Sequence, residues 1–198
     1  MPYQYKREPL SDKETSHLTG SPIKKNILIT GLPGLGKTTM IRKISDALKE
    51  LHPAGFYTEE IREEGIRKGF ELVSLDGRRG HLSHVDIMSP HRVGKYKVDI
   101  RAFEDFLDSI RFFHPSTCLI IIDEIGKMEC FSDKFKKLLI EILDSEKGLI
   151  ATIALKGSGL IEEIKERKDI ELFTITQTNR DSLLSEILKE ATPKISFP

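Results

Sequence analysis

The sequence has few cysteines, no long apolar run and no net charge, and each of these shortages argues against a class of protein. Only two cysteines occur in 198 residues, Cys118 and Cys130, and both lie in apolar surroundings. This number disfavours a disulfide scaffold and favours reduced thiols. No apolar run is long enough to span a bilayer, and the N-terminus lacks a signal-peptide pattern. We therefore expect a soluble, cytoplasmic protein with no membrane partner.

The charges of the chain balance, with 31 Lys and Arg against 31 Asp and Glu. Such a chain has no net field that attracts nucleic acid, so nucleic-acid binding is unsupported, although a local basic groove stays open as an alternative. The length predicts one domain with a substantial core, which we expect to be a monomer. Residues 1–22 are polar and mixed in charge, which predicts a flexible extension before a domain at 23–198.

The most informative segment is Gly31–Thr38, GLPGLGKT, which matches the P-loop pattern G-x-x-x-x-G-K-[ST] at every position. Its glycines permit backbone angles that turn successive N–H groups toward phosphate oxygens. Lys37 adds a cation for the β- and γ-phosphates, and Thr38 adds a hydroxyl ligand for Mg²⁺. The predicted nucleotide-binding residues in this region are Gly31, Leu32, Pro33, Gly34, Leu35, Gly36, Lys37, Thr38 and Thr39.

The segments on either side of the P-loop support this interpretation. Asn26–Thr30 is a short apolar run that reads as a buried strand. After the loop, apolar residues recur on one face of a predicted helix: Met40, Ile41, Ile44, Leu48 and Leu51. A strand, a glycine loop and a helix in this order place the positive end of the helix dipole at a bound phosphate.

The region after the first helix has a different character. Gly55–Thr58 opens an extended segment, and Gly69–Leu75 alternates between apolar and polar residues in the manner of a strand. Turns are predicted at Gly65 and at Asp76-Gly77. The sequence therefore predicts an antiparallel hairpin or meander inserted after the first helix.

The rest of the chain alternates strands with helices. Predicted strands are Lys95–Ile100, Leu119–Ile122, Leu149–Leu155 and Leu172–Thr176. Predicted helices are Ala102–Phe113, a helix with an apolar face of Phe131, Phe135, Leu138, Leu139, Ile142 and Leu143 that stops at Gly148, then Leu160–Glu166 and Ser182–Lys189. This order predicts an α/β fold of the P-loop NTPase type. We expect a three-layer sandwich with a mostly parallel central sheet and the inserted antiparallel hairpin.

Two carboxylates follow the most apolar strand. Leu119–Ile122 runs into Asp123 and Glu124, the pattern of a Walker B strand whose Asp holds Mg²⁺ opposite the P-loop hydroxyl. Because ligands of open α/β sheets bind beyond the carboxyl ends of the strands, we expect Asp123 beside Thr38 as a metal ligand. Glu124 is predicted to orient or deprotonate the attacking water. The alternative for Glu124 is a solvated acid that caps the next turn.

Residues 123–126 also satisfy D-x-x-G, the metal-side motif of GTPases, which adds Gly126 to the predicted nucleotide contacts. No N-K-x-D guanine signature occurs, so a dedicated GTPase is a minor alternative. Asn179, between the last strand and the last helix, is predicted either to contact the base or to cap the helix. Positive charge for the transition state is available from Lys37 and from six further residues, none of which a pattern singles out: Lys127, Arg62, Arg67, Arg78, Arg79 and Arg92.

These segments together resemble the THEP-type nucleoside-triphosphatases, a family that includes the cancer-related nucleoside-triphosphatase of animals. The resemblance runs from about Lys25 to Glu190 and rests on GLPGLGKTT, GFYTEEIREEGIRKGFELVSLDG, GKYKVDI, CLIIIDEIGKME and ERKDIELFTITQTNRD. It implies a compact P-loop domain that hydrolyses nucleoside triphosphates to diphosphates with Mg²⁺ and loose base preference. It also implies nucleotide contacts at Gly31–Thr38 and at Asp123 and Glu124.

Two other functions use the same motifs. A kinase would move the γ-phosphate to a nucleoside, a nucleotide or an RNA end, with Glu124 deprotonating the acceptor hydroxyl instead of water. Kinases of small acceptors usually carry a lid with clustered arginines, and the stretch from Lys127 to Leu155 contains no arginine. The third function is a nucleotide-dependent switch with slow hydrolysis. The leading prediction is hydrolysis of ATP, GTP, CTP and UTP.

Overall fold

The structure is a computed structural model and describes residues 26–191. The extension predicted at residues 1–22, with its boundary to the domain, lies outside the described residues and stays a prediction. The described residues hold no helix that is long and apolar enough to cross a membrane.

One mixed sheet runs through the described residues, in the strand order β5-β6-β4-β3-β2-β7-β8-β1-β9. The strands are β1 (Asn26–Thr30), β2 (Ala54–Glu63), β3 (Ile66–Ser74), β4 (Arg79–His84), β5 (Arg92–Val93), β6 (Tyr96–Val98), β7 (Leu119–Ile125), β8 (Gly148–Ile153) and β9 (Ile170–Thr174). In this strand order, each pair of neighbours in the part β2-β7-β8-β1-β9 is parallel. Each pair of neighbours in the part β5-β6-β4-β3-β2 is antiparallel. The α/β fold is as predicted, and the sheet is mixed, with four parallel and four antiparallel pairs, where a mostly parallel sheet was predicted.

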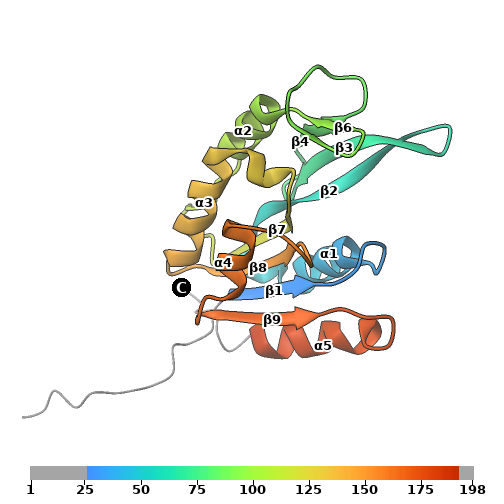
Figure 1. Cartoon of the computed structure of the whole chain (residues 1–198). Helices are drawn as coiled ribbons and strands as arrows, with labels where there is room; N and C mark the ends of the chain where they lie inside the picture. The colour runs from blue at the N-terminus through green and yellow to red at the C-terminus, as the bar shows by residue number, and fades with distance from the viewer. Residues whose placement is uncertain (1–25, 192–198) are drawn as a thin grey trace, which may run out of the picture.

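The helices form the outer two layers (Figure 1). They are α1 (Lys37–Ala47), α2 (Ile100–Ser109), α3 (Asp133–Asp144), α4 (Leu160–Lys165) and α5 (Arg180–Ala191), with short 3-10 turns η1 (Lys49–Leu51) and η2 (Glu129–Phe131). Buried residues of α1 and α5 share one apolar cluster, and those of α2, α3 and α4 share another. The two clusters lie on opposite faces of the sheet.

Alternation along the central strands produces these two clusters. In β1, Ile27 and Ile29 pack in the α1 and α5 cluster, whereas Leu28 packs in the other one. In β7, Ile120 and Ile122 face α2 and α3 while Ile121 faces α1. All of them are at most 1% exposed. Strands covered on both faces read as continuous apolar runs, which is why the sequence identified them.

The meander differs from a simple inserted hairpin. Its first strand, β2, pairs in parallel with β7 at Ala54–Phe56 and antiparallel with β3 along its outer part. The chain therefore extends the central sheet instead of adding a separate hairpin to it (Figure 1). The predicted turn at Gly65 joins β2 to β3, and the turn at Asp76-Gly77 joins β3 to β4.

Several predicted boundaries were wrong by a few residues. The first helix ends at Ala47, so that Leu51 belongs to η1. Ile100 begins α2, because Asp99 accepts a hydrogen bond from the Ala102 N–H and caps that helix. Ser132 caps α3 in the same way through the Phe135 N–H, which leaves Phe131 in η2. Gly148 opens β8 instead of ending α3, which stops at Asp144.

The ends of the last strand and of the last helix also differ from the predicted ones. β9 begins at Ile170 and ends at Thr174, two residues earlier at each end than predicted. The last helix is longer than predicted and begins at Arg180, where the carbonyl of Asn179 accepts the first helical hydrogen bonds.

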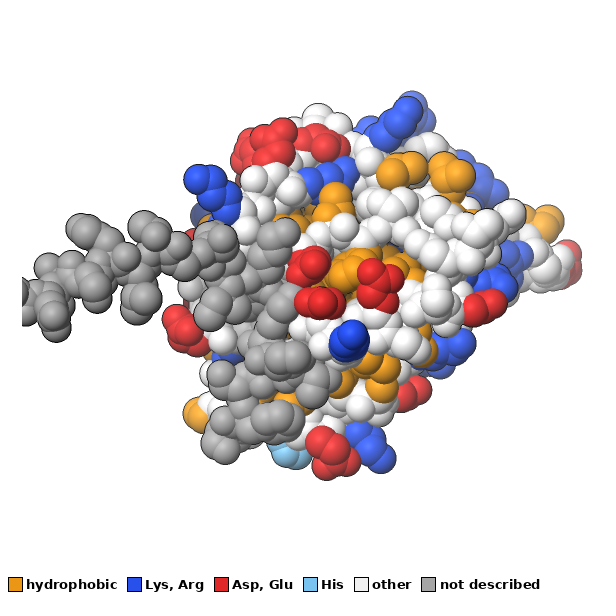
Figure 2. Space-filling view, turned by 90° about the horizontal axis from the view of Figure 1, so that it is seen from below, with side chains coloured by type: hydrophobic (Ala, Val, Ile, Leu, Met, Phe, Trp, Pro, Cys, Tyr) orange, Lys and Arg blue, Asp and Glu red, His pale blue; other side chains and the backbone are white. Residues whose placement is uncertain are grey.

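Figure 2 views the side on which β9 and α5 lie, and there the acidic and basic side chains that can be seen form small groups of each sign.

Candidate functional site

The P-loop backbone has the form that a phosphate cradle needs. Gly36, directly before α1, has φ 88°, and Gly34 has φ 81°, a left-handed conformation that glycine adopts without strain. Gly31 approaches the chain after β9 so closely that a Cβ there would lie 2.6 Å from Ile175 Cγ2 and 2.7 Å from its carbonyl oxygen. The glycines are therefore required by conformation at one end of the loop and by space at the other.

The N-terminus of α1 is open toward this loop. No side chain caps it, and its first turn carries no acidic residue. Its backbone N–H groups are therefore free of side-chain acceptors and can bind an anion, which the helix dipole favours. The predicted contacts around it are accessible to a ligand: Leu32, Pro33, Gly34 and Thr39 are exposed, and Leu35, Gly36, Lys37 and Thr38 are half-buried.

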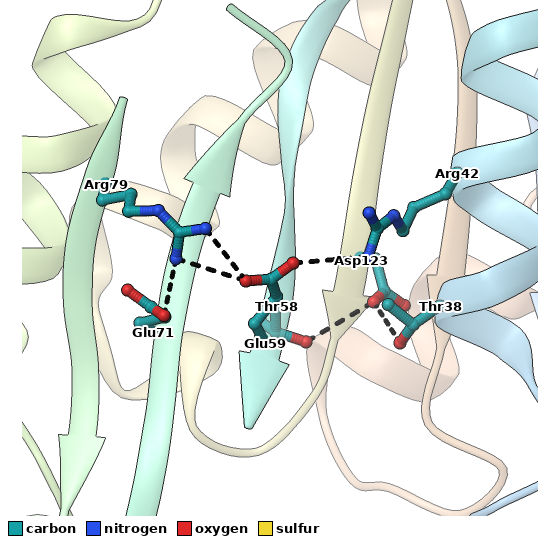
Figure 3. A network of polar contacts seen from close by, with 7 residues as sticks. All are labelled: Thr38, Arg42, Thr58, Glu59, Glu71, Arg79 and Asp123. Carbon is teal, nitrogen blue, oxygen red and sulfur yellow. Dashed lines mark hydrogen bonds and ion pairs between the residues drawn. The ribbon is translucent and has the colours of Figure 1, made fainter. Parts of the chain in front are cut away.

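Asp123 lies at the centre of a group of hydroxyl donors. It is 1% exposed, at the end of β7. Thr38 of α1 donates to its Oδ2 at 2.6 Å, Thr58 of β2 donates to the same oxygen at 3.4 Å, and Thr152 of β8 donates to Oδ1 at 2.5 Å. Figure 3 shows Thr38 and Thr58 converging on Asp123 from two elements. The structure thus brings together the P-loop hydroxyl and the carboxylate that the sequence predicted as a metal pair.

Glu124 lies beside the P-loop lysine. Lys37 Nζ is 3.8 Å from Glu124 Oε2 and also donates to the Gly31 carbonyl at 3.2 Å. Burial raises the pKa of Glu124 above its ordinary value, Lys37 opposes this shift, and Asp123 adds to it. A carboxylate held between Lys37 and Asp123, the predicted metal ligand, is placed to interact with a group bound over the P-loop. The Glu124 side chain is 34% exposed and pairs with Lys37.

The donor set fits a magnesium ion bound together with a nucleotide. Thr38 and Asp123 supply one hydroxyl and one carboxylate that already converge within 2.6 Å. Mg²⁺ is typically held by one or two carboxylates, waters and substrate phosphates instead of an all-protein cage. The described residues contain no group of three or more His, Cys, Asp and Glu side chains arranged for a metal.

The arginines of the meander are engaged with acids of the meander itself. Arg62 and Arg67 pair with Glu60, Arg78 pairs with Asp76, Arg79 pairs with Glu59 and Glu71, and Arg92 lies in the edge strand β5. Figure 3 shows that Glu59 also binds Arg42 of α1, so one carboxylate joins α1 to β4. Within the described part of the chain, none of the five predicted arginines contacts the P-loop through a hydrogen bond or ion pair. Lys127 is exposed on the turn after β7 and lines a cavity with Glu124.

The side chain of Asn179 does not cap α5, which was one of its two predicted roles, and its contact with the base stays a prediction. Its Oδ1 accepts from the N–H and the hydroxyl of Thr176 at 2.7 and 3.0 Å, and its Nδ2 donates to the Thr174 carbonyl at 2.9 Å. The residue occupies the N-cap position of α5, but only its backbone carbonyl accepts from the helix, from Ser182 and Leu183. The side chain instead fixes the loop between β9 and α5.

Comparisons with known proteins show the family of the chain. The NTPase family profile matches residues 26–188. A protein of Thermotoga sp. (strain RQ2) named nucleoside-triphosphatase THEP1 is 48% identical over 163 residues, which cover 82% of this chain and 92% of the relative. The chain belongs to the THEP1-type nucleoside-triphosphatase family. This family consists of hydrolases that act on phosphoric anhydrides.

Two further comparisons extend the family to animals and to a solved structure. The human cancer-related nucleoside-triphosphatase is 41% identical over 180 residues, with 83% of this chain and 95% of that protein covered. The crystal structure of THEP1 from Aquifex aeolicus superposes with a TM-score of 0.75 at 36% identity, covering 83% of this chain and 97% of that one. The nucleoside-triphosphatase fold is therefore shared across nearly the full length of these relatives.

Three polar residues of this nucleoside-triphosphatase site were not predicted from the sequence. Thr58 follows the buried part of β2, and Thr152 is the second-last residue of the fully buried β8. These two strands flank β7, so the place of both threonines near the carboxyl edge of the sheet was the available signal. Glu129 is 5% exposed and lies in η2, close to the predicted contact Gly126, which is itself buried. Nothing in the sequence distinguishes Glu129 from an ordinary surface acid.

Proposed function

We propose that the protein hydrolyses nucleoside triphosphates, including ATP, GTP, CTP and UTP, to nucleoside diphosphate and phosphate, with Mg²⁺ as its cofactor. The observation that carries this proposal is the position of Glu124. Its carboxyl group stands 3.8 Å from Lys37 Nζ and directly follows Asp123, which is hydrogen-bonded to the P-loop hydroxyl. A base beside both charge-neutralising groups is what attack by water on a γ-phosphate requires.

The reaction can be assigned to the residues of this chain. A water oxygen attacks the γ-phosphorus and forms the new P–O bond, while the bond from that phosphorus to the β–γ bridging oxygen breaks. Glu124 accepts the proton of the water, and the nucleoside diphosphate leaves with the bridging oxygen. Lys37 and the N–H groups at the start of α1 stabilise the charge on the transferring group. A bound Mg²⁺, for which Thr38 and Asp123 are the proposed ligands, supplies further charge neutralisation on the phosphate oxygens.

Loose base preference is supported by the cavities beside the P-loop. One cavity of about 390 Å³ is lined by Gly36, Thr39, Met40, Lys43, Arg180, Asp181 and Leu184. Another of about 580 Å³ is lined by Gly31, Leu32, Leu35, Leu155 and residues 174–178. Their walls combine aliphatic side chains with polar ones that are mostly exposed. Strong discrimination would need buried polar partners for one base.

The kinase alternative gains no support from the comparisons, because the relatives are named nucleoside-triphosphatases. A kinase would need an acceptor for the γ-phosphate, whereas a hydrolase would not, so the two functions can be separated by leaving the acceptor out. Phosphate release should be measured with each of the four triphosphates in the absence of any acceptor. Turnover that appears only when a nucleoside, a nucleotide or RNA is added would overturn the proposal in favour of a kinase.

Two variants test the assigned roles. Glu124→Gln keeps the shape of the side chain but loses its basic oxygen, so we expect kcat to fall by at least about a hundredfold while nucleotide affinity is largely kept. Asp123→Asn should instead raise the Mg²⁺ requirement and weaken binding of the metal–nucleotide complex. Glu163→Gln, an exposed position on α4, is the matched control and should hydrolyse normally. If Glu124→Gln turns over at the wild-type rate, the base is another residue.

A further inference from the structure

A second acid is buried next to the proposed base. Glu129 lies in η2, the turn that follows β7, and only 5% of its surface is exposed. Gly126 lies between the carboxyl groups of Glu129 and Glu124. A Cβ at Gly126 would be 2.9 Å from Glu129 Oε2 and 3.3 Å from Glu124 Oε1. One carboxyl oxygen of each glutamate therefore stands over the same small glycine.

The two oxygens of Glu124 face different neighbours. Oε2 is the oxygen that lies 3.8 Å from Lys37 Nζ, on the side of the P-loop. Oε1 is the oxygen over Gly126, on the side of Glu129. A hydrogen bond from Glu129 to Oε1 would therefore fix the direction in which Oε2 faces a substrate over the P-loop.

Glu129 has a reason to keep its proton. Burial raises the pKa of its carboxyl group to about 8, and the negative charges of Glu124 and Asp123 add to the shift, while backbone N–H groups of Glu129 and Gly126 oppose it. Within the described part of the chain no Lys, Arg or His forms an ion pair with it. At neutral pH the group is then a neutral acid, which can donate a hydrogen bond that a carboxylate cannot.

The other charged groups around this turn are few. Lys127 is exposed in the same turn and lines a cavity of about 290 Å³ with Glu124 and Glu129. On the α2 side, Glu104 accepts a hydrogen bond from Ser132, just after η2. The ring of His91 stacks on Phe131 at 5.2 Å between centroids. The cavity shared by both glutamates is large enough to hold a water molecule between them.

We propose that Glu129 is a positioning residue for Glu124, and that its carboxyl proton is donated to Glu124 Oε1 directly or through one water in the shared cavity. The pair then holds one proton, Glu124 remains the ionised member, and its Oε2 is fixed toward Lys37 and the attacking water. This inference rests on the proposed function of Glu124 as the base. The competing explanation is a structural one, in which Glu129 only accepts hydrogen bonds from the backbone of its turn.

The first experiment is a comparison of pH profiles. We expect wild-type kcat, at saturating MgATP, to fall on the alkaline side with a midpoint near pH 8, because ionised Glu129 no longer donates to Glu124 and repels it. Glu129→Gln keeps a neutral donor of the same shape. It should retain neutral-pH kcat within about threefold, and its alkaline limb should move by more than one pH unit or disappear. An unchanged limb in Glu129→Gln overturns the proposal.

Removal of the donor is the second arm. Glu129→Ala should lower kcat at pH 7 by more than tenfold, with the dissociation constant of MgADP changed by less than threefold. Wild-type kcat in this variant means that Glu129 is structural only. If Glu129→Ala does not fold, as judged by circular dichroism and melting, the Glu129→Gln profile decides alone. The exposed Glu163→Gln serves as the control for both arms.

The third arm does not depend on activity. Carboxyl ¹³C resonances, assigned with Glu129→Gln and Glu124→Gln, should show Glu129 titrating near pH 8 in the nucleotide-free protein. A Glu129 that titrates below pH 6 overturns the proposal. Failure of the proposed function would look different, since wild type would then release no phosphate or Glu124→Gln would remain fully active.

Discussion

Thr38 Oγ1 lies 2.6 Å from Asp123 Oδ2, although 85 residues separate them in the chain. The contact joins the first turn of α1 to the carboxyl-terminal part of β7. The strand before α1 is β1, and β1 is not a neighbour of β7 in the sheet, because β8 runs between them. Both ends are held by regular structure, because Thr38 lies in the first turn of α1 and Asp123 ends a fully buried run of β7. The contact between the two predicted metal ligands is thus a product of the sheet order.

The first prediction concerns Lys37. Its ammonium group is held near both Gly31 and Glu124, where it would neutralise charge on the transferring phosphoryl group. Lys37→Ala should lower kcat well beyond tenfold and weaken triphosphate binding, measured by phosphate release and by titration with a fluorescent nucleotide. Retention of more than about a tenth of wild-type kcat, a loss below roughly 1.4 kcal/mol, would contradict this role.

The parts of this site that the sequence predicted are those with a local pattern. The P-loop needs glycines and a lysine at fixed spacing. The four consecutive apolar residues before Asp123 predict the buried strand β7. The parts that it did not predict depend on the approach of distant segments. The burial of Glu129, the contact from Thr152 and the pairing of Arg79 with Glu59 arise only once strands far apart in the chain lie side by side.

Helix ends show the same limit on a smaller scale. Asp99 and Ser132 are ordinary capping residues, yet each was placed inside or before a predicted element because apolar periodicity continues across it. Capping depends on which backbone N–H group a side chain reaches, and periodicity carries no information about that. For Asn179, contacts with Thr174 and Thr176 draw the side chain away from the helix, so that it does not cap α5.

The second prediction concerns the hydroxyl groups around Asp123. Thr152→Val removes the donor at 2.5 Å from Oδ1 with little change of shape, whereas Thr58→Val removes a longer contact of 3.4 Å. A metal ligand that loses an orienting hydrogen bond typically loses about 10–100-fold in metal affinity. The Mg²⁺ concentration for half-maximal activity should therefore rise about tenfold or more for Thr152→Val and less for Thr58→Val.

The same variants should be tested by calorimetric titration of the metal–nucleotide complex, which separates binding from turnover. Ser185→Ala, at an exposed position on α5, is the control for loss of a hydroxyl group outside the site. Equal and negligible effects at Thr58 and Thr152 would mean that these hydroxyls do not orient a metal ligand.

The third prediction concerns base selectivity. The four triphosphates should show kcat/KM values within about two orders of magnitude, the scale of a few kcal/mol of differential contact. Asn179→Ala removes three hydrogen bonds that fix the loop beside the P-loop, so it should lower kcat/KM for all four substrates by a similar factor. A change in the ratio between bases would show that Asn179 turns toward the base when nucleotide binds.

The last prediction concerns the stability of the nucleotide-free protein as a function of pH. The carboxyl group of Glu129 has a pKa of about 8 in the folded protein against an ordinary value of 4.5. Between these two values the unfolded chain has already lost the proton and the folded chain still holds it. Because the unfolded state binds fewer protons in this range, the free energy of unfolding must fall as pH rises.

The contribution is therefore fully present below about pH 4.5 and is lost as pH rises through about 8, at roughly 1.4 kcal/mol per unit of pKa difference. Glu129→Gln has no proton to lose, so its free energy of unfolding should decline less between pH 5 and 8.5 than that of wild type, by an amount of the order of several kcal/mol. Urea unfolding at several pH values measures both curves, and all other titrating groups cancel in the comparison. Parallel curves would mean that Glu129 is already ionised in the folded protein, and the neutral donor beside Glu124 would then not exist.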